Sequence, residues 1–163
     1  MTNKISEHIS YKEVIHSTTA KRNGISNIPS KKQLRSIKLL ADNVFEPLRS
    51  FVGGRIKITS MFRSLELNSL LGGSKTSQHL KGEAMDLDDT FGHKTNKQMG
   101  DYIREELDFD QLIYEFLDDN GDVKWIHASY KASGNRNEVL IAWKDPSGKT
   151  VYLPYEQHKY LLN

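Results

Sequence analysis

Residues 77–86 (SQHLKGEAMD) place a histidine and an aspartate, His79 and Asp86, seven positions apart with small residues between them. This spacing does not fit the helical His-x-x-x-His ligand pair. It fits a loop that enters a strand, in which Gly82 permits a turn and Ala84 permits close packing. The stretch therefore predicts a loop-and-strand unit that presents one imidazole and one carboxylate together.

A second short stretch, residues 125–129 (WIHAS), supplies another histidine, His127, within an aromatic and apolar strand. A buried imidazole in such a strand needs a partner. Two histidines and one aspartate are a near variant of the ligand set of zinc metallopeptidases, which leaves one coordination position open for water. We therefore predict that His79, Asp86 and His127 together hold one Zn2+ ion.

Helical periodicity dominates the first half of the chain. Ser30 is a favourable N-cap, and apolar residues follow it at three- and four-residue spacing. Pro47 falls late in this pattern and is expected to kink the helix, which Gly53 ends. Thr95 opens another helix with a capping-box pattern through Gln98. The expected helices span residues 11–16, 30–52, 66–71 and 95–107.

Strand patterns dominate the second half of the chain. Turn signals at residues 118–122 (DDNGD) and 145–148 (DPSG) join neighbouring strands into hairpins. The expected strands span residues 55–60, 85–88, 111–117, 123–130, 138–144 and 149–153. Because helices come mainly first and adjacent strands last, we predict an α+β fold with a mostly antiparallel central sheet flanked by helices.

Length and composition indicate an ordinary globular protein of one domain. The 163 residues suit a single domain, with a polar N-terminal segment at 1–30 and a core at 31–163. A net charge of +2 is too weak to argue for nucleic acid as a partner, and the absence of cysteine excludes disulfides and thiolate metal sites. Residues 1–25 contain no apolar run, so we expect no secretory signal and no membrane insertion. We expect a monomer.

A hydrolase with a metal site also needs a base for the attacking water. The simplest hairpin turn pairs Leu117 with Val123. Glu115 then lies opposite Trp125 and diagonal to His127 on the same face of the sheet. A register shift of one residue would reverse this placement. We therefore predict that Glu115 is the catalytic base, on condition that this register holds.

Two further polar residues surround the predicted metal loop. Arg63 follows the strand at 55–60, and an arginine at that place is suited to bind a substrate carboxylate or to stabilise an oxyanion. A structural ion pair is the alternative role for Arg63. Ser77, two residues before His79, is placed to hydrogen-bond the substrate or to orient the loop.

These residues resemble the zinc D-alanyl-D-alanine carboxypeptidase family, in the group that also includes lysostaphin-type peptidases and the Hedgehog signalling domain. The family pattern Ser-x-His-x-x-Gly-x-Ala-x-Asp is met at every fixed position of residues 77–86, and Trp-x-His-x-Ser is met at 125–129. The segments 62–64 (FRS) and 72–77 (GGSKTS) are also similar to the family. The resemblance covers residues 10–143.

The resemblance implies a Hedgehog/DD-peptidase-like fold and zinc-dependent hydrolysis of peptidoglycan stem peptides or crosslinks next to a D-amino acid. Relatives often place the catalytic glutamate three residues before the last histidine, where this chain has Lys124. Glu115 takes that role in our interpretation, and Arg63 binds the substrate carbonyl or carboxylate. Another acidic residue as base is the alternative.

Three functional hypotheses follow from the resemblance. The first is a peptidase that trims a terminal D-Ala or cuts a crosslink, and the second cuts L-alanyl–D-glutamate bonds with the same metal site. The third is a zinc-binding module without catalysis, which the missing glutamate before His127 keeps open. With no expected signal, the enzyme would stay in the cytoplasm until released onto the cell wall, as for a phage endolysin, or recycle wall peptides inside a bacterium.

Overall fold

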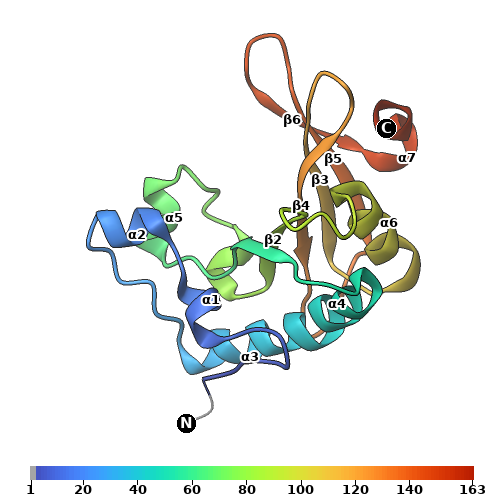
Figure 1. The fold of residues 1–163 in the computed structure, drawn as a ribbon. Coiled ribbons are helices and arrows are strands. Elements are labelled where there is room, and N and C mark those ends of the chain that lie inside the picture. Colours follow the sequence, from blue (N-terminus) through green and yellow to red (C-terminus); the bar gives the residue numbers. More distant parts are fainter. Residues whose placement is uncertain (1–2) are drawn as a thin grey trace.

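The computed structural model describes residues 3–163 as an α+β fold around one six-stranded sheet (Figure 1). The strands are β1 (Lys57–Ser60), β2 (Ala84–Asp88), β3 (Gln111–Leu117), β4 (Val123–Ser129), β5 (Glu138–Lys144) and β6 (Thr150–Pro154). Their order across the sheet is β1-β2-β4-β3-β5-β6. Only β3 and β5 run parallel among these neighbours. The predicted α+β class and mostly antiparallel sheet are therefore confirmed.

The structure contains most of the helices that the sequence predicts. They are α1 (Tyr11–Ile15), α2 (Thr18–Arg22), α3 (Lys31–Leu40), α4 (Glu46–Val52), α5 (Leu65–Leu70), α6 (Asn96–Glu106) and α7 (Tyr155–His158). Two 3-10 helices, η2 (Gln78–Lys81) and η3 (Lys159–Leu161), complete them. The sequence analysis missed α2 and the helical turns after β6. Within residues 3–163, no helix is both long and apolar enough to cross a membrane.

The long helix predicted after Ser30 is present but divided. Ser30 forms the predicted N-cap, in a reciprocal capping box with Gln33. Between α3 and α4, five residues form the π-helix η1 (Ala41–Phe45), and Pro47 follows in the first turn of α4. Proline has no amide hydrogen for the preceding turn, so a wider turn accommodates it without ending the helix.

Strand alternation divides the sheet into two chemically different faces. The face that packs against the helices is apolar and fully buried. It presents Met85, Leu87, Leu112, Tyr114, Ile126, Ala128 and Ile141 to residues of α3, α4 and α6. Ile9 and Val14, from the first thirty residues, belong to the same core. Burial of this face fixes the register, because a shift of one residue would turn every side chain to the opposite side.

The opposite face carries the polar residues of the candidate site, and one row of paired residues on it runs across four strands. Asp86 of β2 pairs with His127 of β4, and His127 pairs with Ile113 of β3, which pairs in turn with Leu140 of β5. The hairpin register also pairs Glu115 with Trp125, as predicted from the sequence. The helices therefore hold one face of the sheet and leave the other face free for a site.

A substitution at Gly100 in α6 would test how closely this helix packs against the sheet. Replacing a glycine inside a helix with alanine ordinarily stabilises the helix by about 1 kcal/mol. Here the added Cβ would lie 2.6 Å from Cε1 of Tyr114 and 2.9 Å from Cδ1 of Ile126, both buried. We therefore expect Gly100→Ala to lower the free energy of unfolding by about 1–3 kcal/mol in denaturant titrations.

The matched control is Glu106→Ala, a change at an exposed position of the same helix. It should alter the free energy of unfolding by no more than about 0.5 kcal/mol. A stabilised Gly100→Ala protein would contradict the close approach of α6 to the sheet.

Candidate metal centre

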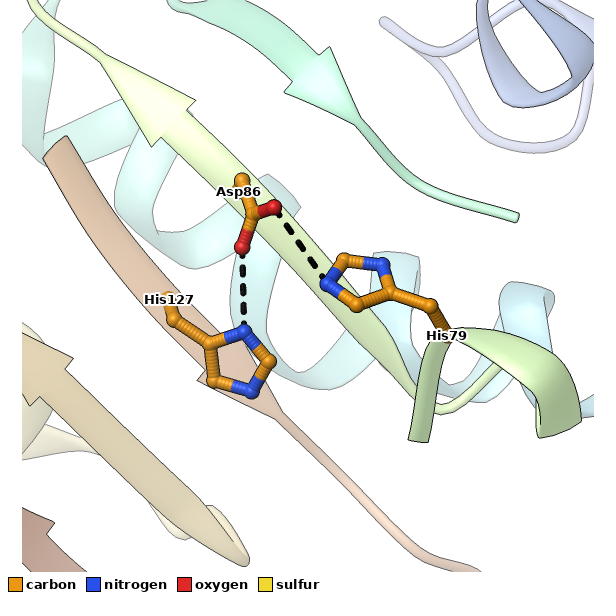
Figure 2. Close-up of side chains that lie close together, drawn as sticks. All are labelled: His79, Asp86 and His127. Atoms are coloured by element: carbon orange, nitrogen blue, oxygen red, sulfur yellow. Dashed lines mark hydrogen bonds and ion pairs between the residues drawn. The ribbon is translucent and has the colours of Figure 1, made fainter. Parts of the chain in front are cut away.

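Three side chains from separate elements converge at one end of the polar face. His79 comes from η2, Asp86 from β2 and His127 from β4, and Figure 2 shows the carboxylate of Asp86 between the two imidazoles. One ligand atom of each residue lies within 4.8 Å of the other two. The structure thus brings together all three residues that the sequence singles out as metal ligands.

Hydrogen bonds fix how these rings are oriented. His79 Nδ1 lies 2.6 Å from the carbonyl oxygen of Met61, so this nitrogen donates and Nε2 faces Asp86 Oδ2 at 3.3 Å. Nδ1 of His127 lies 3.0 Å from the other oxygen, Oδ1. The side chains of His79, Asp86 and His127 are 4%, 10% and 12% exposed. Metal-binding histidines are typically oriented in this way, by a hydrogen bond from the ring nitrogen that does not bind the metal, as for His79.

Gly82 explains why the loop before Asp86 can take this path. Its φ is +71°, and a Cβ there would lie 2.7 Å from the backbone oxygen of Gln33 and 2.8 Å from Ile37. Gln33 in turn donates its side-chain amide to the carbonyl of Leu80 at 2.8 Å. Helix α3 therefore holds the loop that carries His79, and only glycine fits at the contact point.

Asp86 is the charged centre of the cluster. Burial by itself raises the pKa of its carboxyl group, but the charge of His79 and the hydrogen bonds from His127 and His79 outweigh burial and hold this pKa well below its usual range. Nη2 of Arg63 lies 2.9 Å from Oδ2 of Asp86, and Nε of Arg63 donates to Ser60 at 3.0 Å. Arg63 therefore contacts a predicted ligand directly.

Glu115 lies on the adjacent strand β3, on the same face as His127. Burial is the main cause that raises the pKa of its carboxyl group to about 7. The positive charges of His127 and Arg63 lower this pKa, and the negative charge of Asp86 raises it. A carboxyl group that titrates near neutral pH in a cleft is suited to take and return protons. Lys124, where relatives often carry a glutamate, is exposed.

These residues open into a cleft of about 800 Å³. Arg63, Ser77, Glu115 and Trp125 line it together with the three clustered residues. Ser77 immediately precedes η2, in the loop that includes Gly73. The structure thus places every residue that the sequence analysis assigned to the site in one cleft, although their roles stay predictions.

The sequence analysis missed a polar network at the cleft wall. The carboxylate of Asp110 accepts hydrogen bonds from Arg136 at 2.7 and 3.0 Å and from Gln78 at 3.0 Å, and it lies 2.9 Å from Nζ of Lys131. Its side chain is only 1% exposed. No local motif links residue 110 to residue 136, because the contact exists only when β5 pairs with β3.

Two residues from the last strands were missed as well. Leu140 of β5 and Tyr152 of β6 also line the cleft. The hairpin that carries them was predicted, and its alternation places Leu140 and Ala142 on one face. The missing information was that β5 joins the edge of β3, which brings the hairpin beside Glu115.

The clustered donor atoms fit a metal ion by their chemistry. Two imidazole nitrogens and one carboxylate oxygen converge, and the hydrogen bond from Nδ1 of His79 to Met61 leaves Nε2 as the nitrogen that would bind a metal ion after releasing its proton. Such a set, with three protein ligands and room left for a fourth, is the set found in catalytic metal sites of hydrolases. The cluster and the cleft thus have the features of a metal-dependent hydrolase centre.

Comparison with known protein families supports this class. The model of the family Peptidase M15 matches residues 7–128, three quarters of the chain, and the chain therefore belongs to this family of metallopeptidases. The matched segment includes His79, Asp86, Glu115 and His127, and it ends before β5. A comparison with curated proteins finds no match.

The raised pKa of Glu115 gives a stability test on metal-free protein. Between the ordinary value of 4.5 and about 7, the folded state holds a proton that the unfolded state has released, so stability falls as pH rises through this interval. Glu115→Gln removes this effect. Relative to the variant, the wild type should lose up to about 3 kcal/mol of unfolding free energy between pH 4.5 and 8.

This comparison is made by urea titration of both proteins with chelator at the two pH values. An equal difference between wild type and Glu115→Gln at pH 4.5 and pH 8 would contradict the raised pKa of this half-buried carboxyl group.

Asp110 gives a second test, of the cleft wall. Asp110→Asn removes the buried charge that pairs with Lys131 and Arg136, and should lower the free energy of unfolding by about 2–4 kcal/mol in denaturant titrations. The exposed pair of Lys159 and Glu156 is the control, because Lys159→Ala should cost at most about 1 kcal/mol. Equal effects of the two variants would contradict the buried network.

Proposed function

We propose that the protein is a zinc-dependent peptidase that hydrolyses peptidoglycan stem peptides or crosslinks next to D-amino acids, as D-Ala-D-Ala carboxypeptidases and endopeptidases do. The observation that carries this proposal is the position of Glu115, a carboxyl group with a pKa of about 7 on the same sheet face as the His79, Asp86 and His127 cluster. Membership of the Peptidase M15 family supports the peptidase reaction. The motif resemblance supports the wall-peptide substrate.

His79, Asp86 and His127 would hold the zinc ion through Nε2, a carboxylate oxygen and Nδ1. Zinc, when bound, supplies Lewis acidity, which acidifies water and polarises a carbonyl group. The tight contact of Met61 with His79 keeps one ligand ring in place without any metal. Zinc is the expected ion because imidazole and carboxylate ligands of this number are its usual protein environment.

Glu115 would act as general base and then as general acid. In its ionised form its carboxylate takes a proton from the attacking water, and in its protonated form it gives that proton to the leaving amide nitrogen. A pKa of about 7 keeps both forms accessible near neutral pH.

Arg63 and Ser77 would position the substrate. Nε and Nη2 of Arg63 are engaged by Ser60 and Asp86, which holds the guanidinium at the cleft wall. Its remaining N–H groups would bind a substrate carbonyl or carboxylate. The hydroxyl group of Ser77 lies in the loop before η2 and lines the same cleft. It would hydrogen-bond the peptide backbone beside the cleaved bond.

The test is hydrolysis of defined substrates by zinc-loaded protein. Purified peptidoglycan and soluble stem peptides ending in D-Ala-D-Ala are incubated with the enzyme, and the products are identified by mass spectrometry. We expect release of D-Ala or cleavage of a crosslink, with a loss of at least about a hundredfold in kcat for Glu115→Gln because a general base is removed. Chelator and His127→Ala should abolish the products.

The matched control is Lys124→Ala, which changes an exposed residue of the same strand three positions before His127. It should keep both activity and bound zinc, measured by elemental analysis, whereas His127→Ala should lose zinc. Cleavage between L-Ala and D-Glu would assign the alternative bond. Stoichiometric zinc without any product would contradict the peptidase and identify a binding module.

A further inference from the structure

The last hairpin of the fold forms one wall of the cleft. Strands β5 and β6 lie beyond residues 7–128, the segment matched by the family model. Leu140 of β5 and Tyr152 of β6 nevertheless line the same cleft as Glu115 and His127. This wall is therefore built from a part of the chain that the family match does not cover, and it is a candidate for substrate selection.

Sheet register places Tyr152 close to the predicted base. Tyr114 pairs with Ile141 in the parallel ladder, so Glu115 and Ala142, the next residues along, are neighbours on the cleft face. Ala142 pairs with Tyr152. Ala142 is small and fully buried beneath its neighbours, so Glu115 and Tyr152, on the strands to either side of it, both reach the cleft, whereas Ala142 does not line it.

The electrostatic environment of Tyr152 agrees with this placement. Burial raises the pKa of its phenol group, and the negative charges of Glu115 and Asp86 raise it further. The phenol therefore stays protonated and is a hydrogen-bond donor. Within residues 3–163 its hydroxyl group is paired with no other side chain by a hydrogen bond, and the residue is 52% exposed. A half-exposed tyrosine beside a cleft can contact a ligand through its apolar ring and donate a hydrogen bond from its hydroxyl group.

We propose that Tyr152 is a substrate-contacting residue that selects a small apolar side chain beside the cleaved bond. Its ring, with Leu140 and Ile113, forms an apolar part of the cleft wall that takes a side chain such as the methyl group of D-Ala. Its hydroxyl group donates to a backbone carbonyl of the same peptide. This inference rests on the proposed peptidase function and adds a specificity residue to it.

The experiment separates binding from catalysis. Zinc-loaded Glu115→Gln protein is titrated calorimetrically with a stem peptide that ends in D-Ala-D-Ala and with a matched peptide that ends in Gly-Gly. Adding Tyr152→Ala should weaken binding of the D-Ala peptide by about 10–50-fold, and Tyr152→Phe, which removes only the hydroxyl group, by about 3–10-fold. With Glu115 intact, the same changes should raise KM more than they lower kcat.

The preference for D-Ala over Gly is the readout that a merely structural role would not move. One methyl group in an apolar pocket is worth about tenfold in discrimination, and Tyr152→Ala should remove most of this preference. The matched control is Tyr160→Ala, since Tyr160 is 76% exposed and follows α7 outside the cleft lining. This control should leave affinity and preference unchanged.

The outcomes distinguish this inference from the proposed function. If the wild type cleaves stem peptides but Tyr152→Ala keeps wild-type affinity and preference, the role of Tyr152 is overturned and the peptidase stands. If the wild type, loaded with zinc, neither binds nor cleaves any stem peptide, the proposed function is overturned and the role of Tyr152 with it.

Discussion

The buried carboxylate of Asp86 is the constraint on which the site depends. A carboxylate that is 10% exposed is costly unless charged or hydrogen-bonding partners surround it. His79, His127 and Arg63 all meet it within 3.3 Å, each from a different element. The need to satisfy one buried charge therefore ties η2, β4 and the segment after β1 to strand β2. The same contacts hold the three donor atoms within 4.8 Å of one another, close enough for one metal ion.

The two faces of the sheet differ in a way that stabilises this arrangement: one is apolar and buried, and the other carries the polar residues. One face is buried against α3, α4 and α6, and the large apolar burial there holds the register. The polar face can then carry Asp86, His127 and Glu115 in fixed positions. Regular alternation in β4 places Lys124, three residues before His127, on the opposite side of the strand, where it is exposed. Glu115, diagonal to His127 on the next strand, lies on the same face as the metal-ligand candidates.

Much of the fold and most of the site were predictable because their signals are local. Capping boxes at Ser30 and Thr95, turn sequences and strand alternation fixed where the helices and strands lie. The hairpin register that faces Glu115 towards the cleft followed from the length of one turn. The parallel pairing of β3 with β5 was not predictable, since nothing in either strand specifies its partner. The contact of Asp110 with Arg136 and the approach of Tyr152 to Glu115 depend on that pairing.

The sequence by itself determined the metal-ligand candidates, because His79 and Asp86 lie within one short motif and His127 within another. It also determined the glycine that the loop requires, because only glycine takes a left-handed φ at so close a contact. Only the tertiary structure decided what surrounds these ligands. Long-range strand pairing brought the half-buried carboxyl group of Glu115, the charged network around Asp110 and the wall formed by β5 and β6 to one cleft. Partial burial and the neighbouring charges then set the pKa of Glu115. Such effects depend on the distances between segments remote in the chain, which a sequence motif does not encode.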